Sequence, residues 1–180
     1  IVALLAAGCV QTGGTRRSSD NNAGVSADPS DAEKRASVRL ELAGGYFSRG
    51  QFNTALDEIK LALAAKPDMG AAHNMRGLVY AAMGEDRLAE ESFERAMSLN
   101  PRDADAMHNR AWFKCQRGQY DDADRLFEQA IATPQYRDLA RSLMAQGICN
   151  FRSGRLVPAE QKLLRAYEVD PTNPTTAYNL

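Results

Sequence analysis

The sequence has little of what catalysis or metal binding requires. Only three cysteines and two histidines occur among its 180 residues. His73 and His108 have no cysteine or carboxylate partner at metal-ligand spacing, and neither lies in an HExxH pattern. No P-loop, Rossmann fingerprint or nucleophile elbow occurs, and Gly44-Gly45 lacks the Lys and Ser or Thr of a phosphate site. We therefore expect no enzymatic activity, cofactor, metal or small-molecule substrate.

The sequence also lacks an excess of charge and a long apolar run. Lys plus Arg number 22 against 23 acidic residues, for a net charge of −1, so the chain has no field with which to bind nucleic acid phosphates. The longest apolar stretch, residues 1–8, is much shorter than the roughly 20 residues of a transmembrane helix. The hydrophobic content of 44% is enough for a folded core.

The first residues resemble the end of a lipoprotein signal peptide. Residues 1–8 are apolar and small, and Leu5-Ala6-Ala7-Gly8 directly precede Cys9. This order resembles the lipobox of bacterial prolipoproteins, in which Cys9 would be lipidated and become the mature N-terminus. Val10 and Gln11 stand where an inner-membrane retention signal would have Asp, which favours the outer membrane. The alternative is a short apolar leader with an incidental cysteine.

A polar segment separates this leader from the rest of the chain. Residues 11–31 are mainly Gly, Ser, Thr, Asn and Asp, with almost no large apolar side chain. Such a composition buries too little surface to offset the loss of conformational entropy on ordering. We therefore interpret residues 9–32 as a flexible tether.

Beyond the tether the sequence repeats with a period of about 34 residues. Alanine recurs at Ala55, Ala89, Ala123 and Ala159. Five residues before each alanine stands a glycine suited to a helix-ending turn, at Gly50, Gly84, Gly118 and Gly154. Four and seven residues after it stand Ile59 and Ala62, Phe93 and Ala96, Phe127 and Ala130, and Leu163 and Ala166. This i, i+4, i+7 stripe predicts four amphipathic helices, each following a partner helix.

The partner helices carry a small residue where the two helices pack most closely, at Ala43, Gly77, Ala111 and Gly147. The pattern resembles the tetratricopeptide repeat family over roughly residues 36–173. This resemblance implies an all-α, right-handed solenoid of antiparallel helix pairs. We expect pairs at 36–69, 70–103, 104–137 and 140–173, with the third connection lengthened by two residues around Pro134. Residues 174–180 would begin a truncated fifth pair, so we expect the sequence to be part of a longer protein.

In tetratricopeptide proteins the first helices line a concave groove, and the repeat frame converts this into candidate contacts. The candidates are Leu40, Gly44, Phe47, Asn74, Leu78, Ala81, His108, Trp112, Met144, Ile148 and Phe151. The set is mostly apolar and aromatic, which predicts an extended or helical peptide ligand with hydrophobic anchors. Leu40 and Gly44 stand where a groove for acidic chaperone tails would have cationic or amide groups. Several candidates, including His108, Trp112 and Phe151, have a purely structural alternative.

Two cysteines fall on neighbouring first helices. Cys115 and Cys149 lie in the third and fourth pairs, and a disulfide between them would suit an oxidising periplasm. Their positions within the helix differ by two, so the spacing allows the bond without requiring it. Two buried free thiols are the alternative.

The third and fourth pairs carry a more specific resemblance. The runs Asn109–Gln116 and Ala145–Cys149, with Pro134-Gln135-Tyr136 between them, together with the lipobox, are similar to the type IV pilus biogenesis and stability lipoproteins, the PilF/PilW family. The resemblance implies an outer-membrane lipoprotein on the periplasmic face that helps the pilus secretin to assemble or reach the outer membrane. The alternative function is a periplasmic tetratricopeptide lipoprotein that mediates protein–protein interactions in another envelope complex.

Overall fold

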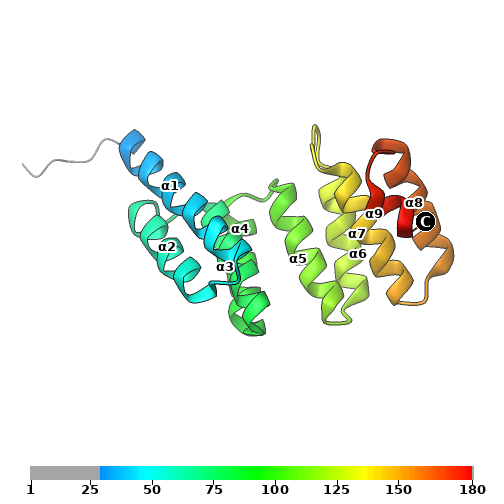
Figure 1. Ribbon diagram of the computed structural model, residues 1–180, viewed down its shortest axis with the longest axis horizontal. Helices are drawn as coiled ribbons and strands as arrows, with labels where there is room; N and C mark the ends of the chain where they lie inside the picture. Colours follow the sequence, from blue (N-terminus) through cyan, green and yellow to red (C-terminus); the bar gives the residue numbers. More distant parts are fainter. Residues whose placement is uncertain (1–28, 180) are drawn as a thin grey trace, which may run out of the picture.

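The computed structural model describes residues 29–179, and all the regular secondary structure in that part of the chain is α-helical (Figure 1). The helices are α1 (Pro29–Ser48), α2 (Phe52–Ala65), α3 (Gly70–Met83), α4 (Asp86–Leu99), α5 (Ala104–Gln116), α6 (Tyr120–Ile131), α7 (Leu139–Arg152), α8 (Leu156–Val169) and α9 (Pro174–Asn179). The all-α fold class is as predicted.

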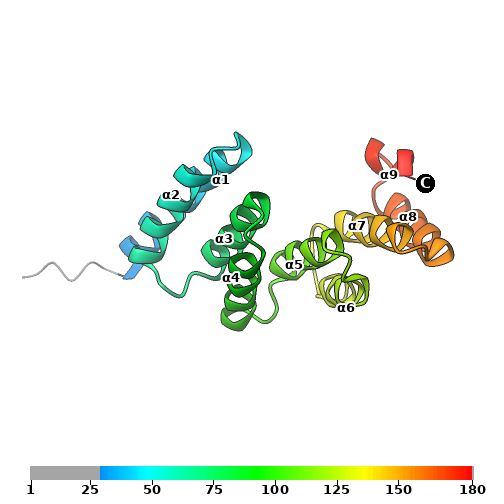
Figure 2. The same ribbon diagram turned by 90° about the horizontal axis from the view of Figure 1, so that it is seen from below.

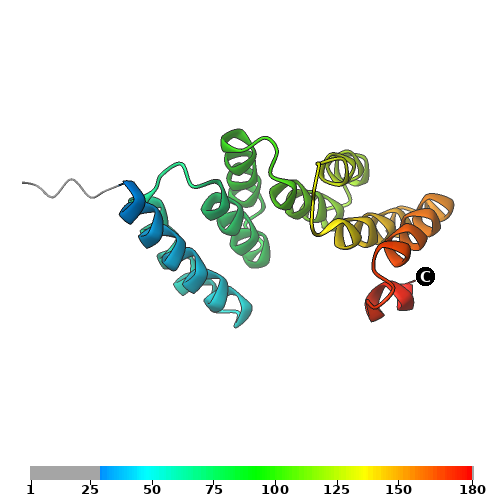
Figure 3. The same ribbon diagram turned by 90° about the horizontal axis from the view of Figure 1, so that it is seen from above.

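The first eight helices form four antiparallel pairs that follow one another along the long axis of the molecule (Figures 2 and 3). The first helices α1, α3, α5 and α7 contact one another in that order, and each second helix packs on the first helix that follows it. The first helices therefore line the inner side of the array, and the second helices lie outside. This is the solenoid arrangement of tetratricopeptide repeats.

The turn inside each pair depends on a glycine. Gly50, Gly84, Gly118 and Gly154 have φ angles between 72° and 80°, in the left-handed region that other L-residues rarely adopt. This conformation ends the first helix, and the next residues begin the second helix.

Close packing within each pair accounts for the other recurring small residues. A Cβ atom on Gly77 would lie 2.6 Å from the ring of Phe93, and one on Gly147 would lie 2.7 Å from Leu163. Phe93 is fully buried and Leu163 nearly so, as are the alanines on either side of them in the stripe. The small-to-large interlocking predicted from the sequence therefore holds the two helices of these pairs together.

One boundary differs from the sequence-based expectation, and one backbone conformation was not part of it. The first helix begins at Pro29, so the last four residues of the predicted tether, 9–32, are helical. Proline fits the first helical position because its missing N–H would have no partner there, and Asp31 in the first turn is favoured by the helix dipole. The lengthened third connection contains Gln135 with φ 60°, a left-handed residue that is not glycine.

The predicted signal-peptide remnant, residues 1–8, and the lipidation site Cys9 lie outside the described residues. Among the described helices, none is both long enough and apolar enough to cross a membrane.

Candidate functional site: the inner face of the solenoid

The candidate contacts lie on the face formed by α1, α3, α5 and α7, which we call the inner face. One row along this face consists of Gly44, Leu78, Trp112 and Ile148, and all four are half-buried. Each first helix contributes one residue, at the same position in the repeat, and the row crosses the array from the first pair to the fourth. It forms the apolar part of the inner face.

Several candidates also contribute to the core. Phe47 packs against the cluster that contains Ala43 and Ile59, and its ring lies 5.9 Å from that of Phe52. Leu40 packs on a neighbouring cluster, and Leu78 packs against Phe93. Each of these side chains is therefore in part a core residue as well as a candidate contact.

Leu78 and Ala81 share one core cluster, and Trp112 packs beside the buried Cys115. The guanidinium of Arg152 lies 5.1 Å from the centre of the Trp112 ring, in a cation–π geometry. Phe151, next to Arg152, is 64% exposed and is the most accessible apolar candidate on this face.

His108 is a correction to the predicted contact set. It is only 6% exposed, its Nδ1 lies 2.8 Å from the hydroxyl of Ser142, and its Nε2 accepts a hydrogen bond from Arg141 Nε at 3.0 Å. Because Nε2 is an acceptor, the ring is neutral and Nδ1–H donates to Ser142. Burial, and then the charge of Arg141, lower the His108 pKa to about 3. His108 is therefore a buried link between α5 and α7, which favours its structural alternative.

The His108–Ser142 pair also does not form a catalytic dyad. Ser142 is fully buried, and its hydroxyl lies 3.0 Å from that of Tyr136. A nucleophile must reach its substrate and a base must have a free nitrogen, and neither condition is met here. In the described part of the chain, no three His, Cys, Asp or Glu residues are grouped as metal ligands.

Beside the apolar row runs a polar ladder that the sequence analysis missed. Asn109 Nδ2 donates to Asn74 Oδ1 at 3.3 Å, and Arg141 Nη2 donates to Asn109 Oδ1 at 3.1 Å. Asp138 holds the guanidinium of Arg141 from the other side. Asn74 was a candidate, but Asn109 is 35 residues further on, one off the repeat period, and therefore lay outside the frame used to choose candidates.

Cys115 and Cys149 form a disulfide in the structure, with Cα atoms 5.8 Å apart. Both residues are buried, at 2% exposure, in one cluster with Ala111 and Phe127. The bond links α5 to α7 beneath Trp112 and ties the third pair to the fourth.

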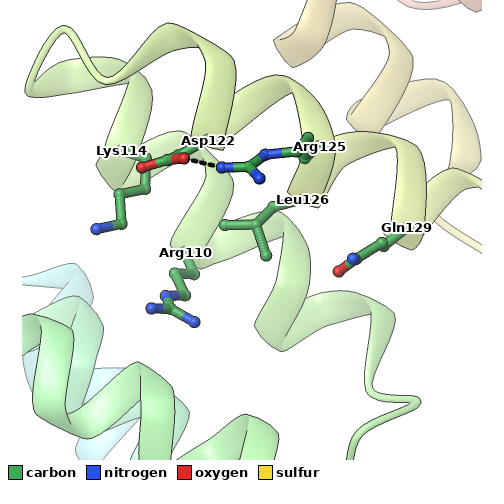
Figure 4. A pocket seen from close by; sticks show the side chains of 6 residues that line it. All are labelled: Arg110, Lys114, Asp122, Arg125, Leu126 and Gln129. Atoms are coloured by element: carbon green, nitrogen blue, oxygen red, sulfur yellow. Dashed lines mark hydrogen bonds and ion pairs between the residues drawn. The ribbon is translucent and has the colours of Figure 1, made fainter.

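A second polar feature lies between the second and third pairs, beside a cavity of about 260 Å³ (Figure 4). The cavity is lined by Arg110, Lys114, Asp122, Arg125, Leu126 and Gln129. Arg110 and Lys114 are both paired with Glu90 of α4, and Arg110 also reaches Glu94. Arg125 is paired with Asp122. Since these cations already have carboxylate partners, the cavity is not an anion-binding site.

Comparison with known proteins agrees with the helical-repeat fold described above. Models of the tetratricopeptide repeat match residues 70–103, 92–125 and 115–174, which together span more than half of the chain. The type IV pilus assembly protein PilF of Pseudomonas aeruginosa is 23% identical over 180 residues, covering all of this chain and 68% of that protein. An uncharacterized protein of Haemophilus influenzae is 26% identical over 147 residues, covering 81% of each chain.

Two solved structures share the arrangement. The structure of P. aeruginosa PilF superposes with a TM-score of 0.78 at 20% identity, covering 82% of this chain and 67% of that one. The structure of PilW, described as a widely conserved type IV pilus biogenesis factor, superposes with a TM-score of 0.74 at 27% identity, covering 78% of this chain and 64% of PilW. The chain thus spans about two thirds of the length of these pilus proteins. It belongs to the tetratricopeptide repeat family, and it resembles the tetratricopeptide proteins of type IV pilus biogenesis.

Proposed function

We propose that this protein is an outer-membrane lipoprotein scaffold for type IV pilus biogenesis, which binds the pilus secretin and assists its assembly or its localisation in the outer membrane. The observation that carries the proposal is the similarity to PilF, which extends over the whole length of the chain. The lipobox-like residues before Cys9 support membrane attachment on the periplasmic side. A non-catalytic role fits a fold that presents surfaces for protein binding.

The inner face is the proposed secretin-binding surface. Its apolar row, from Gly44 to Ile148, offers contacts for hydrophobic side chains of a partner segment, and the exposed ring of Phe151 extends this area at the fourth pair. The ladder of Asn74, Asn109 and Arg141 provides polar groups beside it. A lipid anchor at Cys9 would keep this face near the membrane and raise its effective concentration toward a membrane-embedded partner.

Phe47 and Leu78 are poor positions at which to test this surface. Alanine at either site would remove core packing as well as a contact, so lost function would be ambiguous. At Gly44 an added Cβ would meet only the terminal methyl of Met75, at 3.8 Å, which is an ordinary contact. Gly44→Gln should therefore preserve the fold and place a bulky polar side chain on the inner face. Phe151→Ala removes an exposed ring with little effect on packing.

The experiment is complementation of a deletion strain with the wild-type gene, Gly44→Gln, Phe151→Ala or Cys9→Ala, followed by measurement of secretin multimers and twitching motility. We expect few multimers in the deletion strain and with Gly44→Gln, an intermediate number with Phe151→Ala, and mislocalised multimers with Cys9→Ala. Normal multimers and motility in the deletion strain would contradict the pilus role. The protein would then be assigned to another envelope complex.

A further inference from the structure

Each first helix after α1 uses the same three positions to receive the second helix of the preceding pair. On α3 these positions are Ala72, Arg76 and Val79, and Val79 shares a core cluster with Ile59 of α2. The corresponding positions one and two repeats further on are Ala106, Arg110 and Phe113 of α5, and Ser142, Gln146 and Cys149 of α7.

Contacts to the preceding helix recur at these positions. Arg110 pairs with Glu90 of α4, and the ring of Phe113 lies 5.7 Å from that of Phe93. On α7, the amide of Gln146 donates to Asp124 and Glu128 of α6. The fold therefore places an outer helix on this face three times.

On α1 the equivalent residues are Val38, Leu42 and Gly45, and no helix of the described chain covers them. Val38 is 57% exposed and Leu42 is 42% exposed. A Cβ on Gly45 would meet only the guanidinium of Arg49, at 3.7 Å. Together they form an apolar stripe with space for a close neighbour at one end.

Gly45 has no role in the fold that requires glycine. It lies inside α1, where glycine is unfavourable relative to alanine, it does not have a positive φ, and no neighbouring side chain crowds it as Phe93 crowds Gly77. The absence of a side chain at this position leaves room for another chain to approach α1 closely.

Two arginines flank the stripe at helical spacing. Arg35 precedes Val38 by three residues, Arg49 follows Gly45 by four, and both are exposed. The residue equivalent to Arg49 two pairs further on is Arg117, which is bonded to Asp86 in the first turn of the helix packed against it. The two flanking arginines therefore match a helix with acidic residues near its ends.

We propose that Arg35, Val38, Leu42, Gly45 and Arg49, called here the N-terminal face, dock an amphipathic helix of a partner protein. This helix carries apolar residues at i, i+4 and i+7 and an acidic residue in its first turn, opposite Arg49. The surface is separate from the inner face, so the proposal does not depend on what the inner face binds.

Other parts of this chain match the required chemistry less well. Residues 11–28 have no row of apolar residues at helical spacing, and Arg16-Arg17 would repel the flanking arginines. In a second copy, α8 has exposed apolar side chains, but its first turn contains no acidic residue. A helix of another protein fits this chemistry better than either of these segments.

Photo-crosslinking in cells tests this directly. The full-length protein carries benzoylphenylalanine at position 38 or 42, or at the matched control Leu61 on α2, which is 47% exposed. We expect positions 38 and 42 to form an intermolecular crosslink with a yield at least several-fold above that from position 61. The crosslinked peptide should carry the helical pattern stated above. A crosslink to residues 1–28, a crosslink to a second copy, or a yield equal to that of position 61 would overturn the proposal.

Adjacent glycines provide the control that separates the two surfaces. Gly45→Gln fills the N-terminal face, whereas Gly44→Gln fills the inner face with the same side chain on the same helix. We expect Gly45→Gln to lower the crosslink yield from position 42 roughly tenfold, equivalent to about 1.4 kcal/mol, and Gly44→Gln to leave it unchanged. Equal loss with both variants, or no loss with Gly45→Gln, would contradict the assignment. If Gly44→Gln reduces secretin multimers and Gly45→Gln does not, the result bears on the proposed pilus function and not on the N-terminal face.

Discussion

Two junctions of the solenoid join equivalent helix pairs by different chemistry. Between the second and third pairs, Arg110 and Lys114 of α5 share Glu90 of α4, and Arg117 bonds Asp86. These side chains are partly accessible to solvent, with 15–30% exposure for the cations. Such a junction depends on charge and is screened by salt.

Between the third and fourth pairs, the first helices α5 and α7 are joined by a covalent bond and by hydrogen bonds to neutral groups, whereas the ion pairs of that junction, Lys162–Glu128 and Arg155–Asp121, link α6 to the fourth pair. The Cys115–Cys149 disulfide and the His108–Ser142 hydrogen bond join α5 to α7, and both are buried. Arg110 and Gln146 occupy the same position on their helices, yet one brings a charge and the other an amide. The repeat thus constrains the backbone and leaves the chemistry of each junction free, so the two halves of the array should respond to different conditions.

Removing the disulfide should have the largest effect. The bond closes a loop of 34 residues, so Cys115→Ala with Cys149→Ala should lower the free energy of unfolding by about 3–4 kcal/mol. The melting midpoint, measured by circular dichroism, should fall by roughly 10 °C. A reducing agent should lower the midpoint of the wild type similarly and leave the variant unaffected. If Cys115 and Cys149 both titrate as thiols in the denatured, unreduced wild type, in addition to any thiol of Cys9, the bond is absent.

Acid should weaken the same junction. The His108 pKa falls from 6.5 to about 3 on folding, so the unfolded chain binds more protons between these values. The stabilisation is present above pH 6.5 and is lost as the pH falls toward 3, because a protonated ring would be a buried charge and would also face the Arg141 guanidinium. Between pH 7 and pH 5 the loss is about 2 kcal/mol. His108→Gln should flatten this part of the pH profile in urea titrations, although His73 also has a lowered pKa. An unchanged profile would contradict the assignment.

Neutralising Glu90 should weaken the charged junction by a smaller amount. Glu90→Gln keeps the shape but leaves Arg110 and Lys114 without their shared carboxylate, which should cost about 1–2 kcal/mol at low salt and less in 0.5 M salt. The control is Glu91→Gln, since the exposed Arg87–Glu91 pair should contribute at most about 0.5 kcal/mol. Urea titrations at two salt concentrations make the comparison. A loss with Glu90→Gln that does not depend on salt would mean that the junction is not held by charge.

The sequence predicted the features that recur with the period and missed those that do not. The turn glycines, the buried stripe and the close packing at Gly77 follow from the repeat, because each position has the same neighbours in every copy. The Asn74–Asn109–Arg141 ladder crosses between copies with a shift of register, and a single-period frame does not detect such a contact.

For a related reason, the repeat frame left open whether His108 is a groove contact or a structural residue. Its position predicts a groove contact, but Ser142 and Arg141 of α7 hydrogen-bond its two ring nitrogens, and Tyr136 of the lengthened connection bonds Ser142. Local insertions change what surrounds a repeat position, and periodicity does not describe them.

Exchanging the chemistry at one position should have the smallest net effect and should test the comparison most directly. Gln146 donates to Asp124 and Glu128, so Gln146→Arg would place a cation between two carboxylates, as Arg110 lies between Glu90 and Glu94. Gln146 is fully buried, and the gain in attraction is offset by desolvation and tighter packing, so stability at low salt should change by less than about 1 kcal/mol. The salt dependence of unfolding should nevertheless increase, since a neutral contact becomes charged. If the variant keeps the salt dependence of the wild type, the difference between the junctions does not arise at this position, and the shared carboxylate of Glu90 would have to account for it alone.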